Sequence, residues 1–177
     1  MIDDRTDALR AILKSQYHAC LAMLREAIES CPAELWLDDE PTNAFWQIAY
    51  HALFFTHFYL QPKASDFRPW KQHQANVQNP DGIAGPPDPN SSLPLIPEPY
   101  SKEQVLMYWK ICDDMIDGGV DRLDLDSPES GFSWYKVPKL EHQIINIRHT
   151  AHHTAQLADR LRASSDVGVR WVGHRRA

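Results

Sequence analysis

The sequence is poor in cysteine, and its three cysteines, Cys20, Cys31 and Cys112, follow no regular spacing. We predict that Cys20 and Cys31 lie on or beside one helix, where their separation corresponds to about 16 Å of rise. A disulfide needs Cα atoms within about 7 Å, which excludes a bond between these two within the chain. An odd, unpatterned set of cysteines is typical of a reducing compartment, so we expect a cytoplasmic protein.

Long apolar runs and basic segments are missing as well. No apolar stretch is long enough to span a bilayer, and the acidic N-terminus, residues 1–5, does not resemble a signal peptide. The net charge is −6, and the only basic cluster is Arg170, Arg175 and Arg176 near the C-terminus. The chain also has no glycine-rich phosphate loop and no G-x-S-x-G nucleophile motif. We therefore expect neither a membrane nor a nucleic acid as partner.

The first third of the chain predicts two helices. Residues 4–31 carry apolar side chains three or four positions apart, and Pro32 ends this helix. A second helix is predicted from about 41 to 61, with Thr42 as its N-cap. It is apolar on nearly every face and contains His51, so we expect it to be surrounded by protein.

A proline-rich crossing, residues 62–100, separates this helix from the next one. It holds nine of the thirteen prolines, but it is too apolar for a simple linker, so we expect it to pack across the helices. Its large apolar residues are Phe67, Trp70, Leu93, Leu95 and Ile96. The third helix is predicted to begin with a capping box formed by Ser101 and Gln104. It ends at Gly118-Gly119, or slightly past them near Leu123.

The fourth helix is predicted over residues 139–164, which contain no proline or glycine. His149 and His153 lie four residues apart, and residues at that spacing share one helix face. Two convergent imidazoles are half of a metal site, and a third histidine from another helix would complete a site with an open position. The spacing alone is also typical of a polar surface, because it lacks the glutamate of the H-E-x-x-H motif.

Four helices with one long crossing indicate an all-α four-helix bundle in which the second and third helices run parallel. We predict a single domain over residues 1–163, followed by a loose tail, 164–177. In the tail, Val169, Trp171 and Val172 are the residues able to dock on the bundle.

The order of these motifs resembles the DinB family, also described as DinB/YfiT-like metalloenzymes. The resemblance rests on His51 early in the second helix, a long connection, and His149-x-x-x-His153-x-x-Gln156 in the last helix. It covers most of the chain, from the second helix to the fourth. It implies an up-down-down-up four-helix bundle in which His51, His149 and His153 bind a divalent metal.

Further expectations follow from this resemblance. The family includes transferases and isomerases that use low-molecular-weight thiols, so it implies a small-molecule substrate and such a thiol as a second cofactor. Dimers are common in the family, which makes a homodimer an expectation here. Imidazole ligands suit several transition metals, of which we take zinc or nickel as first choices. A site of three neutral ligands strongly acidifies a bound water or thiol.

Several neighbouring residues leave alternatives open. His152 is a rival to His153, since it also neighbours His149, but two adjacent histidines cannot face one metal. Gln156 either orients a histidine or lies on the helix surface. His57 is expected to be packed or on the surface, and His142 is expected to be solvated rather than part of the site.

Other polar and aromatic residues offer weaker candidates. Asp113 and Asp114 are candidate general bases, although a solvated acidic face is the simpler interpretation. Trp109 and Trp134 either wall a pocket or belong to the core.

A helical wheel of the fourth helix places its histidines away from its aliphatic face. The stripe expected to face the core consists of Leu140, Ile144, Ile147, Ala151, Ala158 and Leu161. His149 and His153 lie nearly opposite, beside His142, Asn146 and Gln156. The histidines therefore line a polar cleft under the crossing or form a solvated face.

The leading functional hypothesis is a metal-dependent enzyme that activates a thiol or water against a small electrophile, as a thiol transferase, isomerase or hydrolase. The alternative is a metal-binding or stress-response binding module without catalysis, because no convincing second catalytic group is evident. A third hypothesis is a purely structural homodimer.

Overall fold

The computed structural model describes residues 4–38, 43–75, 77–79 and 98–175. Within these ranges the protein is all-α and contains no strand, as the sequence predicted. The α-helices are α1 (Asp4–Ser30), α2 (Ala33–Trp36), α3 (Phe45–Tyr59), α4 (Lys102–Asp121) and α5 (Lys139–Ser165), with a 3-10 helix η1 at Ala64–Asp66. Every helix in the described part of the chain is too short or too polar to cross a bilayer.

The helix ends follow local sequence signals. Pro32 follows α1 closely, and Ser101 caps α4 by accepting a hydrogen bond at its hydroxyl from the Gln104 amide at 3.2 Å. Helix α3 begins at Phe45, later than predicted, and Thr42 lies outside the described residues. The short helix α2 was not predicted, and α4 continues through Gly118-Gly119.

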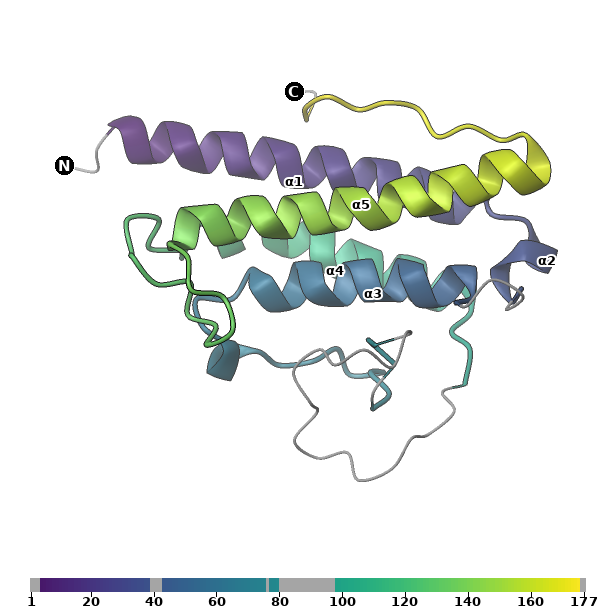
Figure 1. Ribbon diagram of the computed structural model, residues 1–177, viewed down its shortest axis with the longest axis horizontal. Coiled ribbons are helices and arrows are strands. Elements are labelled where there is room, and N and C mark those ends of the chain that lie inside the picture. Colours follow the sequence, from purple (N-terminus) through teal and green to yellow (C-terminus); the bar gives the residue numbers. More distant parts are fainter. Residues whose placement is uncertain (1–3, 39–42, 76, 80–97, 176–177) are drawn as a thin grey trace.

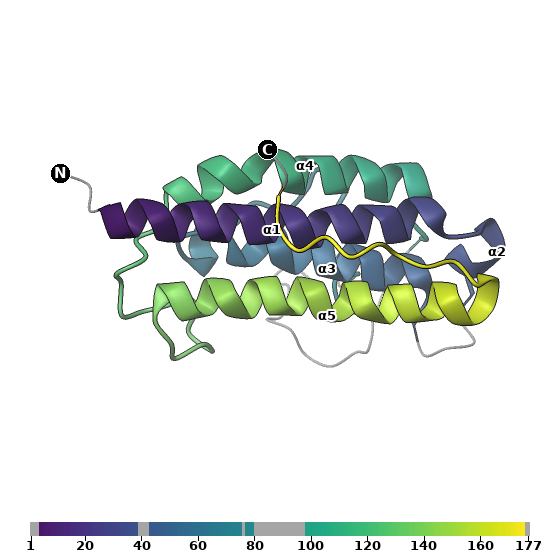
Figure 2. The same ribbon diagram turned by 90° about the horizontal axis from the view of Figure 1, so that it is seen from above.

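The four long helices lie side by side (Figures 1 and 2). Helix α5 packs against α1 and α3, and α4 packs against the same two helices. Helix α3 is buried along nearly its whole length, as its apolar sequence predicts. Its outer side is covered by the described start of the crossing, where Phe67 packs on Phe58. Trp70 of the same segment stacks on Tyr108 of α4 with ring centroids 4.9 Å apart. Leu93, Leu95 and Ile96 lie outside the described residues.

The buried face of α5 is mainly polar, which contradicts the predicted aliphatic stripe except at Leu161, whose side chain is fully buried, and at Leu140 and Ile147, which pack partly against the core. Ile144 is 47% exposed and Ala151 is exposed, whereas the buried residues are mainly polar. These buried polar residues are His142, Gln143, Asn146, Thr150 and Thr154. Gln143, Asn146 and Thr150 make hydrogen bonds to α1 or α3, and the Thr154 hydroxyl donates to the Thr150 carbonyl within α5. Burial of these four side chains is therefore compatible with their polarity.

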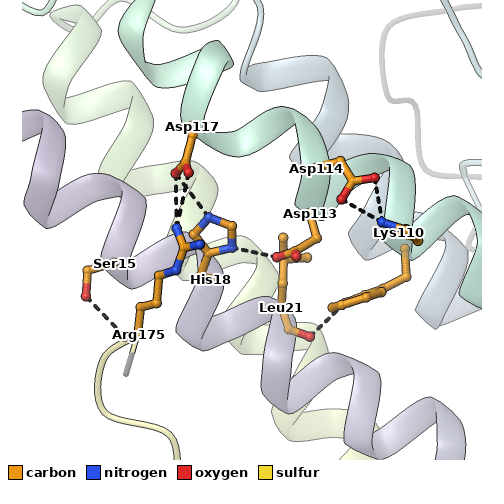
Figure 3. A network of polar contacts seen from close by, with 9 residues as sticks. Ser15, His18, Leu21, Lys110, Asp113, Asp114, Asp117 and Arg175 are labelled. Carbon is orange, nitrogen blue, oxygen red and sulfur yellow. Dashed lines mark hydrogen bonds and ion pairs between the residues drawn. The ribbon is translucent and has the colours of Figure 1, made fainter. Parts of the chain in front are cut away.

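The C-terminal segment, residues 166–175, is docked rather than loose. It runs back along α1 (Figures 1 and 2), and Val169 packs against the core. The Arg175 guanidinium lies 3.2 Å from the Asp117 carboxylate, which also contacts His18 (Figure 3). Trp171, in contrast, is 81% exposed and does not bury its ring.

Candidate metal centre

Three histidines from two helices converge on one point. His51 comes from α3, and His149 and His153 come from successive turns of α5. The Nε2 atom of His149 lies 3.0 Å from Nε2 of His51 and 3.1 Å from Nε2 of His153. One ligand atom from each residue lies within 4.8 Å of the others, and all three side chains are half-buried. The structure thus brings together the three residues that the resemblance implied.

The outer ring nitrogens of two of these histidines face oxygen acceptors. Nδ1 of His51 donates to the Gln78 carbonyl oxygen at 2.6 Å, and Nδ1 of His153 donates to Oε1 of Gln156 at 2.7 Å. A neutral ring that carries its proton on Nδ1 presents a lone pair at Nε2. Two lone pairs are therefore directed at His149 Nε2, which can donate at most one hydrogen. A cation between the three nitrogens would satisfy all of them.

Electrostatics favours the neutral, ligand-competent form of His149. Burial, followed by the proximity of His153 and His51, lowers the pKa of His149 to about 3. Its Nδ1 atom is buried without a hydrogen-bond partner among the described residues. The ring is therefore uncharged at neutral pH and loses no proton when it binds a metal.

The spacing of the three nitrogens fits a transition-metal ion. Tetrahedral zinc with Zn–N bonds of about 2.0–2.1 Å separates two ligand nitrogens by about 3.3 Å. The two observed separations, 3.0 and 3.1 Å, are close to this value. The outer contacts with Gln78 and Gln156 match the second hydrogen bond that metal-binding histidines usually donate. These residues form a group that is able to hold one divalent ion.

An aromatic wall borders the site on the α3 side. The ring of Phe55 lies 4.8 Å from that of His51 and 5.4 Å from that of His149, measured between centroids. An apolar ring at this position limits water on one side of the histidines and lowers the local dielectric, which strengthens electrostatic interactions inside the site.

The other predicted candidates lie elsewhere. His152 is exposed and is not part of the three-histidine group. His57 is partly buried and contacts the Tyr108 hydroxyl at 3.1 Å, while His142 is fully buried, contrary to the prediction that it is solvated. Asp113 and Asp114 pair with His18 and Lys110 (Figure 3).

The two tryptophan candidates also fall outside the group. Trp109 is partly buried against the core and donates from its indole N–H to the Leu21 carbonyl, and Trp134 is 43% exposed.

Of the two residues that accept hydrogen bonds from the site's histidines, the sequence suggested only Gln156. Gln156 was an open alternative, and its side chain does contact His153. The Gln78 carbonyl was not predicted, since every residue carries such a group and no side-chain pattern marks it.

Comparison with known proteins adds no relative. No family model, curated protein or solved structure matches the chain. The chemistry of the site is therefore inferred from its own residues.

Proposed function

We propose that this chain is a DinB-like metal-dependent enzyme that activates a thiol or water against a small electrophilic substrate. His51, His149 and His153 are the proposed ligands of a zinc or nickel ion. The observation that carries the proposal is the convergence of three Nε2 atoms, two of them on rings whose Nδ1 atoms donate to oxygen acceptors. Three protein ligands with an open position are typical of catalytic rather than structural sites.

The proposed fold is the up-down-down-up four-helix arrangement of that family. In Figures 1 and 2 the colours of α1 and α5 advance in one direction along the molecule, and those of α3 and α4 in the other. Packing of α5 against both α1 and α3 supports this arrangement. In this arrangement His51 of α3 lies beside His149 and His153 of α5.

The chain's own residues have distinct proposed roles. The Gln78 carbonyl and the Gln156 side chain hold the Nδ1 protons of His51 and His153 and fix the orientation of both rings. Phe55 excludes water from one side. When loaded, such a site supplies a Lewis acid that lowers the pKa of a coordinated water or thiol. A low-molecular-weight thiol is the proposed nucleophile, by the family resemblance.

Metal content tests the proposal directly. We would measure it by elemental mass spectrometry on untagged wild type and on His51→Ala, His149→Ala and His153→Ala, with circular dichroism as the folding control. His152→Ala is the matched control, because it removes an adjacent histidine outside the group. We expect about one ion per wild-type and His152→Ala chain, and loss in the other three folded variants.

Two results would contradict parts of the proposal. Absence of metal from wild type, even after reconstitution with Zn²⁺ or Ni²⁺, would remove the metal centre. Stoichiometric metal without turnover of any thiol–electrophile pair would favour the alternative, a metal-binding module without catalysis. Turnover that disappears in folded His149→Ala would establish the enzyme.

A further inference from the structure

Ile147, Ala151 and Ala158 of α5 face a groove between α1, α5 and the C-terminal segment, because the polar face of this helix is buried. The groove has a volume of about 550 Å³. Small-molecule sites usually measure about 300–1,000 Å³ and are mostly apolar. The floor consists mainly of small and aliphatic side chains: Ala19, Met23, Ile147, Ala151, Ala155 and Ala158.

The rim of the groove carries a net positive charge. Arg148 and Arg162 both line it and are exposed, and neither guanidinium has a hydrogen bond or ion pair with another described residue. Asp159 is the one acidic residue among the lining side chains of the described chain. The two arginines are separated by about 21 Å along the helix axis. An apolar floor between basic ends is complementary to an elongated anion. A second copy of the chain would instead bring two positively charged rims together.

The C-terminal segment closes one side of the groove through surface contacts. Gln16 donates to the Gly173 carbonyl at 3.1 Å, and Arg170 pairs with Glu26 at 3.1 Å. Exposed ion pairs of this kind contribute at most about 1 kcal/mol each, so they add little to the anchoring that Val169 provides by packing against the core. Trp171 lines the groove but leaves 81% of its surface exposed, so a ligand there would cover its ring.

We propose that this groove is a binding site for an elongated anionic amphiphile, such as a long-chain carboxylate. The hydrocarbon chain lies along the alanine floor, the carboxylate is bound by Arg148 or Arg162, and residues 166–175 form a strap over the chain. The groove lies on the α1 side of α5, whereas His149 and His153 face His51 on α3, so this site is separate from the candidate metal centre.

A fluorescence titration of metal-free protein with sodium dodecanoate tests this proposal independently of the metal centre. We expect saturable binding with a blue shift of tryptophan emission that is absent in Trp171→Phe. Dodecanol and dodecyltrimethylammonium, each below its micelle concentration, should bind at least about tenfold more weakly, a difference of about 1.4 kcal/mol.

Variants locate the binding site. Ala155→Phe adds a ring to an exposed position of the floor and should abolish binding. Arg148→Gln combined with Arg162→Gln should weaken binding about tenfold. Arg68→Gln, which removes an exposed arginine outside the groove, is the matched control and should bind as wild type does.

Three results would overturn the proposal: no saturable binding, equal binding of the three head groups, or binding unchanged in Ala155→Phe. Light scattering would test the alternative occupant of the groove, a second copy of the chain. A wild-type dimer that Ala155→Phe dissociates, together with no dodecanoate binding, would assign the groove to a second copy of the chain.

Discussion

The Tyr17 hydroxyl of α1 lies 2.8 Å from Oε1 of Gln143 on α5, and both side chains are fully buried. Asn146 extends this contact, since its amide donates to the Tyr17 hydroxyl at 2.9 Å and to the Thr56 carbonyl of α3 at 3.2 Å. Buried polar groups are costly when unpaired, so this network fixes the rotation of α5. The same rotation turns His149 toward α3 and His51.

Removal of the Tyr17 hydroxyl tests how much this network contributes to the free energy of unfolding. Tyr17→Phe keeps the ring but leaves Gln143 Oε1 without its donor in a buried place. We expect the free energy of unfolding to fall by about 1–3 kcal/mol. Urea unfolding followed by circular dichroism measures it. A stability equal to that of wild type would show that the network contributes little beyond packing.

The contact between Gln156 and His153 predicts an effect on metal affinity. Gln156→Ala removes the acceptor of the His153 Nδ1 proton, so the ring loses its fixed orientation. We expect zinc affinity, measured by competition with a chelating dye, to fall about 10–100-fold. His152→Ala on the same turn should bind zinc as wild type does. Wild-type affinity in Gln156→Ala would instead make Gln156 an ordinary surface residue.

The burial of His142 predicts a specific pH dependence of stability. Burial, followed by the charge of Lys139, lowers the pKa of His142 to about 4, while the unfolded chain has a value of about 6.5. Between these two values the unfolded state binds more protons, so stability falls as the pH drops from about 6.5 to about 4. This loss ends once the pH lies below both pKa values.

His142→Phe should remove the contribution of His142 to the pH dependence of stability. The ring lies against Tyr59, Phe132 and Tyr135, an aromatic environment that accepts phenylalanine. We expect the slope of stability against pH to decrease by up to about 1.4 kcal/mol per pH unit in this window. Urea unfolding at several pH values, with EDTA present, measures the difference from wild type. An unchanged slope would assign the acid sensitivity to other groups.

The sequence predicted those features that depend on local signals. Pro32 located the C-terminal end of α1 and the Ser101 capping box the start of α4, and the spacing of His149 and His153 indicated a shared helix face. The approach of His51 to this pair depends on the packing of α3 against α5, which spacing does not encode. The family resemblance, not the periodicity, suggested it.

The rotation of α5 could not be predicted for a physical reason. A helical wheel treats Gln143, Asn146 and Thr150 as surface residues, because it does not contain their partners on other helices. Tyr17 and Thr56 supply those partners and make burial of the polar face favourable. The aliphatic stripe was consequently assigned to the core, although Ile144 is about half exposed and only Leu161 of the stripe is fully buried.

The adjacent glycines of α4 provide a matched pair for a last prediction. Alanine stabilises a helix interior relative to glycine by up to about 1 kcal/mol. At exposed Gly118 an added Cβ would meet only the end of the Arg122 side chain, at 3.4 Å. Gly118→Ala should therefore raise the free energy of unfolding by about 0.5–1 kcal/mol.

At buried Gly119 the same substitution would create a steric clash with Leu60. An added Cβ would lie 2.5 Å from Cδ2 and 2.7 Å from Cγ of Leu60, whose side chain is fully buried after the end of α3. Forcing this contact apart costs about 1–3 kcal/mol, more than the gain in helix propensity. Gly119→Ala should therefore unfold at lower urea concentration than wild type, and Gly118→Ala at higher. If the two variants had equal urea midpoints, Leu60 would adopt another rotamer at no cost. Close packing at Gly119 would then not position α4 against α3.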